Sequence, residues 1–428
     1  MKKIHLLTIL ITATTNLNAQ KIYTSDIDNF WKAYDEIHTI KVNKIEIFKT
    51  KYLDNGTIGL KNFANSKEFN EVNYVSAFEK YPNFWKTIRP NTIISEKRIK
   101  KIHQALKRFN QLYPNQSKGN IYFTIGALRS GGMPYNADLI LGLEKIMGDK
   151  TTNTSEFENP TMQNMFKFSN PALLEFVTIH EYIHTFQKGG EINILAKSIK
   201  EGSADFISEL TLKEKYNSHY LDYGYKHYDS IQLQFKTEML TKHFQNWFYN
   251  SENTPHPDLG YFVGYDISKK YYQNSINKKQ AINELINLNY DNEQTVLNIL
   301  SKSQYFKENI NIEELKKSYK NNQPHIVKII EFENGTENIS TNLKQLQIVF
   351  SKPMNDKISI NFSKNGKEYF PLNKITGLNE DKTILSLELI ALKPNTTYDF
   401  YITNRSTIAI DGYPFIDDEY KIEFRTAK

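Results

Sequence analysis

Residues 180–184 read His180-Glu181-Tyr182-Ile183-His184, and the flanking sequence predicts that they lie on a helix. Asn170 and Pro171 suit the start of that helix, and Gly189-Gly190 suits its end. Side chains four positions apart share one helix face, so His180 and His184 can reach a single metal ion. Glu181 projects beside them, where a general base would stand. The alternative is an ordinary helix that carries two surface histidines.

A catalytic zinc ion takes three protein ligands and leaves a fourth position for water, so a third ligand is expected. We predict that it is Glu201, which opens the stretch Glu201-Gly-Ser-Ala-Asp205 on a second amphipathic helix. Asp205, one turn further on, is predicted to accept a hydrogen bond from the outer nitrogen of a ligating histidine. Two alternatives stay open: Asp205 is the ligand and Glu201 supports it, or both are solvated helix acids. Gln187 and Gly190 stand where the metzincin motif needs glycine and histidine, which excludes that class.

Both segments resemble the gluzincin metallopeptidases, in particular a predicted bacterial zinc-peptidase group with a His-Glu-Tyr-x-His-x-x-Gln helix followed by a Glu-Gly-x-Ala-Asp helix. The matching residues are His180, Glu181, Tyr182, His184, Gln187, Glu201, Gly202, Ala204 and Asp205. Softer similarity covers Asn29-Phe30-Trp31-x-x-Tyr34 and Gly260-Tyr261-x-x-Gly264-Tyr265. The resemblance implies a mostly helical, thermolysin-like catalytic domain with a small sheet over residues 21–322, and Zn²⁺ as its cofactor.

Zinc held by two imidazoles and a carboxylate lowers the pKa of its water, and Glu181 is expected to take the proton as that water attacks a carbonyl. The resulting oxyanion needs a second electrophile. Tyr265 is our prediction for this role, and Tyr261, His219 and His227 are the other candidates.

Zincins bind an extended peptide along an edge strand beside the active-site helix. The run Leu139-Ile-Leu-Gly-Leu143 is the candidate edge strand, with Leu139 and Leu141 as substrate-binding residues. The alternative is that this run is an internal strand.

From about residue 323 the composition changes to short, alternating β-type runs, which predicts a β-sandwich over residues 323–428. The segments Phe350–Met354, Leu392–Tyr398, Asp411–Phe415 and Phe424–Thr426 resemble the bacterial Ig-like domain of surface-layer and exported proteins. The resemblance implies a spacer, or a module that docks to the cell surface or cell wall. The predicted fold class is therefore α+β.

The chain has 428 residues, 24% of them charged and 39% hydrophobic, which favours two domains. Its net charge of +6 is too small and scattered for a nucleic-acid partner. The absence of cysteine excludes disulfides, a Cys-based zinc finger and a catalytic thiol.

Residues 1–20 combine Lys2 and Lys3, a short apolar core and the small residue Ala19, which is typical of a cleaved signal peptide. No later run reaches the roughly 20 apolar residues of a transmembrane helix. We therefore expect export to the periplasm or the cell exterior.

Together these features predict an exported zinc metallopeptidase that acts on a peptide or protein substrate. Two other functions remain: a surface or periplasmic binding protein on an inactive zincin scaffold, and a zinc amidase that cuts cell-wall peptide crosslinks.

Overall fold

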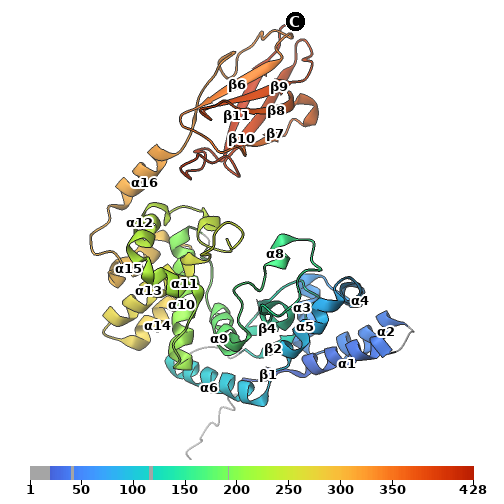
Figure 1. The fold of residues 1–428 in the computed structure, drawn as a ribbon. Coiled ribbons are helices and arrows are strands. Elements are labelled where there is room, and N and C mark those ends of the chain that lie inside the picture. Colours follow the sequence, from blue (N-terminus) through green and yellow to red (C-terminus); the bar gives the residue numbers. More distant parts are fainter. Residues whose placement is uncertain (1–19, 40–42, 115–118, 191) are drawn as a thin grey trace, which may run out of the picture. The chain divides into compact units, whose positions relative to one another are not determined.

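The computed structural model describes residues 20–39, 43–114, 119–190 and 192–428 (Figure 1). It divides into two compact units, Met1–Asn309 and Ile310–Lys428. The first is mostly helical with a small sheet and the second is built on antiparallel strands, which is the predicted α+β class. The predicted signal peptide, apart from Gln20, lies outside the described residues. No helix in the described part of the chain has the length and apolar character to cross a membrane.

The division falls after Asn309 rather than near residue 323, because helix α16 (Ile312–Asn322) groups with the second unit. The ring of Tyr319 packs 5.2 Å from that of Tyr413, and Lys352 Nζ donates to Asn322 O at 2.7 Å. The change in composition marks where the strands begin, whereas the compact unit also includes the helix before them.

The first part of unit 1 is a helical layer packed around aromatic side chains. Its core includes Phe30, Trp31, Tyr74, Phe78 and Trp85, whose rings pack largely edge to face. The helices that supply this layer are α1 (Ser25–Thr39), α2 (Lys44–Phe48), α3 (Ile58–Lys67), α4 (Glu71–Lys80) and α5 (Pro82–Thr92), and α6 (Glu96–Leu112) follows them in the chain.

A four-stranded sheet adjoins this layer, with the strand order β1-β2-β4-β3. Its strands are β1 (Ile22–Tyr23), β2 (Ile121–Thr124), β3 (Gly132–Tyr135) and β4 (Asp138–Gly142). The pairs β1-β2 and β2-β4 are parallel, and β3 runs antiparallel to β4. The chain folds back after β3 through a turn at Asn136, whose φ is +54°, and this hairpin inserts β4 between β2 and β3.

Two helices that follow the sheet, α9 (Leu174–His184) and α10 (Ile194–Leu212), pack against each other. Helix α13 (Leu259–Asn274) packs closely against α10, because Gly202 of α10 and Gly264 of α13 have no side chains where the two backbones meet. A Cβ atom on either glycine would overlap the backbone of the other helix. The other α-helices described in the unit are α7 (Leu143–Ile146), α8 (Pro160–Gln163), α11 (His219–Lys226), α12 (Tyr228–Glu238), α14 (Lys278–Ile286) and α15 (Glu293–Ser303).

Helix α6 contacts one end of α9 and one end of α10. Arg98 donates to Pro171 O at 2.8 Å, just before α9, and binds both oxygens of Glu175 at 3.0 and 2.7 Å. Arg108 donates to the carbonyl of Thr211 at the end of α10 at 2.5 Å. Arg108 thus satisfies a carbonyl at the C-terminal end of α10, and Arg98 pairs with Glu175 in the first turn of α9, so α6 binds both helices.

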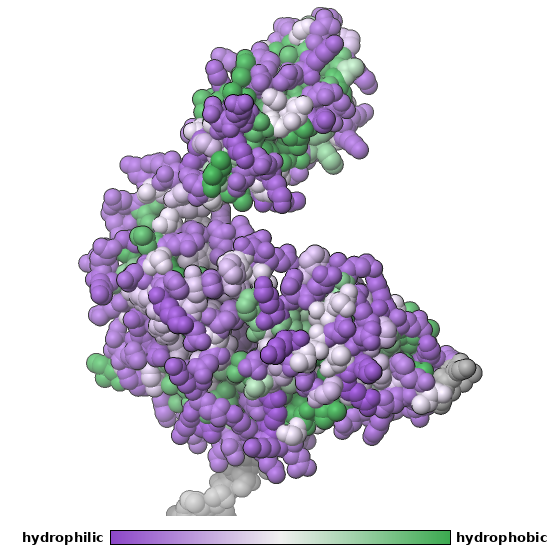
Figure 2. Space-filling model, in the orientation of Figure 1, coloured by the Kyte–Doolittle hydropathy of each residue, from purple (hydrophilic) through white to green (hydrophobic). Residues whose placement is uncertain are grey.

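Unit 2 contains two antiparallel sheets, in the orders β5-β6-β9-β8 and β11-β10-β7. Side chains of both sheets, such as Leu346, Leu385, Phe400 and Ile422, form one buried core, as in a sandwich. The strands are β5 (Ile326–Ile329), β6 (Gln345–Phe350), β7 (Ser359–Phe362), β8 (Leu372–Leu378), β9 (Ile384–Leu389), β10 (Thr397–Thr403) and β11 (Glu419–Arg425). The face of the molecule in Figure 2 is mainly hydrophilic with small separate hydrophobic patches.

Candidate metal centre

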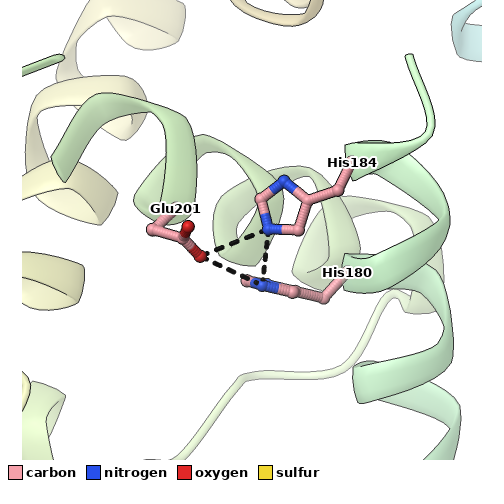
Figure 3. A group of neighbouring side chains, drawn as sticks. All are labelled: His180, His184 and Glu201. Carbon is pink, nitrogen blue, oxygen red and sulfur yellow. Dashed lines mark hydrogen bonds and ion pairs between the residues drawn. The ribbon is translucent and has the colours of Figure 1, made fainter. Parts of the chain in front are cut away.

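Helices α9 and α10 bring the two motif histidines and Glu201 to one point (Figure 3). His184 Nε2 lies 3.0 Å from His180 Nε2 and 3.2 Å from Glu201 Oε2, and His180 Nε2 lies 3.5 Å from the same oxygen. The three ligand atoms all lie within 4.8 Å of one another, so the group could hold a metal ion. The structure thus brings together the three residues that the spacing predicted.

Local sequence explains why both helices start where they do. The Asn170 side chain accepts from Ala172 N at 3.0 Å and caps the 3-10 turn Pro171–Leu173 that leads into α9, and the Asn193 side chain accepts from Ala196 N at 2.9 Å at the start of α10. Asparagine at these positions satisfies amides that have no partner in the first turn. The start of each helix in turn fixes which face carries the ligands.

Asp205 holds the outer nitrogen of His180, as the spacing predicted. Its Oδ1 lies 2.8 Å from His180 Nδ1, and its Oδ2 accepts from Tyr220 Oη at 2.8 Å. A carboxylate only accepts, so the hydrogen of this contact belongs to His180 Nδ1. In the neutral ring Nε2 then carries a free lone pair that points at the other two ligand atoms.

Charge around these histidines favours a cation. Burial alone would lower the pKa of His180, but Asp205 and Glu201 outweigh it and hold the pKa well above its ordinary value. Burial would raise the pKa of Glu201, and the neighbouring His184 and His180 instead hold it well below its ordinary value. The environment therefore supports positive charge at the point where the three ligand atoms meet.

The Gln187 side chain contacts the outer nitrogen of His184, as Asp205 contacts that of His180. Gln187 Oε1 lies 2.7 Å from His184 Nδ1, and its amide nitrogen lies 2.9 Å from Ser203 Oγ and 3.1 Å from Tyr290 Oη. Ser203 Oγ donates to the carbonyl of Lys200 at 3.0 Å, and Tyr290 Oη donates to that of Leu285 at 2.6 Å.

The carbonyl of Lys200, which can only accept, lies 3.4 Å from the side-chain nitrogen of Gln187, and the two hydroxyls, 3.2 Å apart, lie on the same side. That side therefore faces the amide nitrogen of Gln187. Its Oε1 then faces His184 Nδ1, so that nitrogen carries the ring hydrogen. His184 Nε2 is left with its lone pair toward Glu201 and His180.

Tyr265, the predicted oxyanion stabiliser, does not join this group. Its hydroxyl donates to Glu209 Oε1 at 2.9 Å, two helical turns beyond Glu201 on α10. Helix α13 packs along α10, so one turn along α13 moves a side chain away from the three candidate ligands. Tyr261, one turn earlier, lies at the site, with its ring stacked 6.3 Å from that of His180.

Two other tyrosines lie close to Tyr261. Its ring packs 5.5 Å from that of Tyr220, and its hydroxyl donates to Tyr249 Oη at 3.3 Å. Partial desolvation of its hydroxyl raises the pKa of Tyr249 to about 12, although the residue as a whole is 71% exposed, and the carboxylates of Glu201 and Glu181 add to this effect. Tyr249 and Glu181 therefore lie within electrostatic reach of each other, and Glu181 is partly exposed on α9 beside His180.

The two histidines that were alternatives to Tyr265 contact other groups. The ring of His219 stacks 4.4 Å from that of Phe168, and His227 Nδ1 lies 3.0 Å from the carbonyl of Tyr223. Sequence reasoning did not assign the roles of Gln187, Tyr220, Tyr249 and Tyr290. Gln187 gave a signal, since it stands three positions after a ligand, whereas nothing local distinguishes these tyrosines among the 27 of the chain.

The prediction that Leu139 and Leu141 bind substrate on an edge strand is wrong. Strand β4 pairs on both sides, with β2 and with β3, and the two leucine side chains are buried. A continuous apolar run is typical of an interior strand. The strand beside α9 that has one free edge is β3.

No protein-family model matches the chain, and no curated protein is significantly similar to it. Among solved structures, CopC from Methylosinus trichosporium OB3b is 17% identical over 24% of this chain and 94% of that protein, with a TM-score of 0.20. The S-layer protein SbsC is 11% identical over 77% of this chain and 46% of its own, with a TM-score of 0.19. Its N-terminal part is matched over 79% of its length with a TM-score of 0.18. Such weak likeness carries no conclusion about fold or function.

Proposed function

We propose that this protein is a zinc-dependent metallopeptidase. The observation that carries the proposal is the convergence of His180 Nε2, His184 Nε2 and Glu201 Oε2 on one point, with a separate acceptor on the outer nitrogen of each ring. Two imidazoles and one carboxylate are the ligand set of catalytic zinc sites that keep a position open for water. Acceptors on the outer nitrogens orient such ligands and raise their basicity.

Zinc bound by these residues would lower the pKa of a water molecule and polarise the scissile carbonyl. Glu181 takes the proton of the attacking water and passes it to the leaving amine. Its position directly after His180 places it on the α9 surface beside the ligands, and its partial exposure leaves it accessible to substrate.

Tyr261 takes the role that the sequence assigned to Tyr265. Its ring lies against His180, and its hydroxyl hydrogen-bonds to the exposed Tyr249 rather than to a carboxylate such as the half-buried Glu209 that Tyr265 contacts. A hydroxyl whose partner is another exposed hydroxyl can turn toward an oxygen that gains negative charge. Tyr261 therefore serves as the second electrophile for the oxyanion.

Strand β3 gives an extended substrate a place to bind, since it is the edge of the sheet beside α9. The substrate adds to it through the few main-chain hydrogen bonds that this edge leaves open, and otherwise through side chains. As part of the same proposal, the protein is exported, and unit 2 acts as a spacer or as a module that docks to the cell surface or cell wall.

The test is hydrolysis of an unstructured protein and, separately, of peptidoglycan fragments by the zinc-loaded chain from residue 21 onward. Glu181→Gln is the matched control, because it keeps all three ligands and removes the base. We expect the wild type to cleave the protein substrate and the variant to be slower by about 10²-fold or more. Equal rates for the two proteins would contradict the role of Glu181. Cleavage of the cell-wall fragments alone would replace the peptidase by an amidase.

A further inference from the structure

A lysine side chain lies beside the metal centre in a box of aromatic rings. Lys197 stands four residues before Glu201 on α10 and so shares its helix face. Its Nζ lies 5.1 Å from the ring centroid of Phe244, 5.3 Å from that of Phe248 and 5.0 Å from that of Tyr249. Three rings at cation–π distance hold the ammonium group in one place.

Contacts already described join this box to the metal centre. Tyr249 forms one wall of the box and accepts from the hydroxyl of Tyr261, whose ring stacks on that of His180. The ring of Phe248 also packs 5.7 Å from that of Tyr261. The lysine charge therefore borders the space in which a substrate bound at the metal would lie.

The ammonium group of Lys197 has no oxygen partner in the part of the chain that the structure describes. Within those residues no carboxylate lies at ion-pair distance from Nζ, and no oxygen accepts a hydrogen bond from it. Aromatic faces attract the charge but do not accept hydrogen bonds as an oxygen does, so the three N–H donors remain available.

The backbone that carries the Tyr249 ring has an unusual conformation. Tyr249 has a φ of +54° and Asp258 a φ of +65°, and both are rare for residues other than glycine. The Asp258 carboxylate holds the turn by accepting from Tyr249 N at 2.6 Å. Strain of this kind persists where the surrounding structure enforces it, and it is common at binding sites.

We propose that Lys197 binds a carboxylate of the substrate and so selects peptides with a negative charge close to the scissile bond, an inference that rests on the proposed peptidase function. Four residues of helix span about 6 Å along the axis. An extended peptide advances about 3.3 Å per residue, so the carboxylate lies within about two residues of the scissile bond. It belongs either to an Asp or Glu side chain or to the C-terminus of the peptide.

The experiment measures binding rather than turnover, so that it does not depend on catalysis. The zinc-loaded full chain with Glu181→Gln is titrated with two peptide pairs of one sequence. In the first pair a glutamate or a glutamine stands within two residues of the bond that is tested. In the second pair the C-terminus is a free carboxylate or a carboxamide. The pair that shows a preference identifies the source of the carboxylate.

We expect one carboxylate peptide to bind about tenfold or more tightly than its amide partner, because hydrogen bonds to charged groups are the strong ones. Adding Lys197→Met keeps the apolar stem in the box and should abolish the preference while the amide peptide binds unchanged. Lys197→Arg should retain the preference, because arginine also packs on aromatic rings. Lys32→Met removes the same charge from an exposed position on α1 and should leave the preference intact.

Equal binding of both members of both pairs, or a preference that survives Lys197→Met, would overturn the inference. Cleavage of the same peptides by the chain with Glu181 tests the peptidase function separately. Cleavage without a carboxylate preference removes the role of Lys197 alone. A preference that depends on Lys197 without any cleavage removes the peptidase function and leaves the carboxylate site in place.

Discussion

Replacing Gln187 by leucine should weaken metal binding although no ligand is changed. Gln187 Oε1 is the acceptor that keeps the hydrogen of His184 on Nδ1. Without it the ring can carry that hydrogen on Nε2, which faces Glu201 Oε2 at 3.2 Å. The nitrogen that should bind metal would then donate a hydrogen bond to the neighbouring ligand.

The magnitude follows from that new contact. A metal ion must displace a hydrogen bond to a charged carboxylate, which contributes about 1.5–3 kcal/mol. This corresponds to a loss of about 10- to 150-fold in metal affinity, since 1.4 kcal/mol is about tenfold. Ser203 and Tyr290 keep their own hydrogen bonds to backbone carbonyls, so the fold should tolerate the change.

Zinc affinity measured against a competing chelator tests this prediction. Tyr290→Phe is the matched control: it removes one acceptor of the Gln187 amide nitrogen but leaves Ser203 to hold it. We expect the control to bind zinc within about threefold of the wild type, as for loss of a single weak hydrogen bond. A Gln187→Leu variant with wild-type affinity, or a control that loses as much, would refute the assignment of the His184 hydrogen.

Three further changes test other parts of unit 1. Burial raises the pKa of Glu144 from 4.5 to about 7, and its Oε2 has no partner among the described residues. A carboxyl group with a raised folded pKa destabilises the fold as pH rises through that window, by about 3 kcal/mol in all. Glu144→Gln should therefore flatten the loss of unfolding free energy between pH 5 and 8 in denaturant titrations, and an unchanged slope would contradict this. Gly202→Ala should lower stability by about 3 kcal/mol or more and weaken zinc binding, because its Cβ would overlap the backbone of Gly264; an unchanged melting temperature would show that α10 and α13 can separate. Arg98→Met leaves the buried Glu175 without its partner and should cost about 3 kcal/mol in thermal or chemical unfolding, whereas a loss below 1 kcal/mol would mean that water replaces the arginine.

Local spacing was enough to predict which side chains meet at the candidate metal centre. His180 and His184 lie one turn apart on α9, and Glu201 and Asp205 lie one turn apart on α10. The geometry within each pair is set by the helix itself, so it can be read from sequence. The fold class followed for a similar reason, because helical and alternating patterns are local properties.

Contacts between distant segments could not be predicted in this way. Which tyrosine of α13 reaches His180 depends on how far α13 is displaced along α10, and this depends on the contact of Gly202 with Gly264. Likewise the place of β4 inside the sheet depends on the hairpin at Asn136. The apolar residues of β4 do not themselves show which strands pair with its two edges.

Strand β3 has a consequence for how the protein behaves in solution. Its third residue, Pro134, is exposed and has no N–H, so the outer edge of the sheet lacks a donor at that position. A second chain that tried to extend the sheet would meet an interrupted ladder, which discourages aggregation through this edge. The same interruption leaves few main-chain bonds for any peptide that docks there. Side-chain contacts must then decide which partners remain bound.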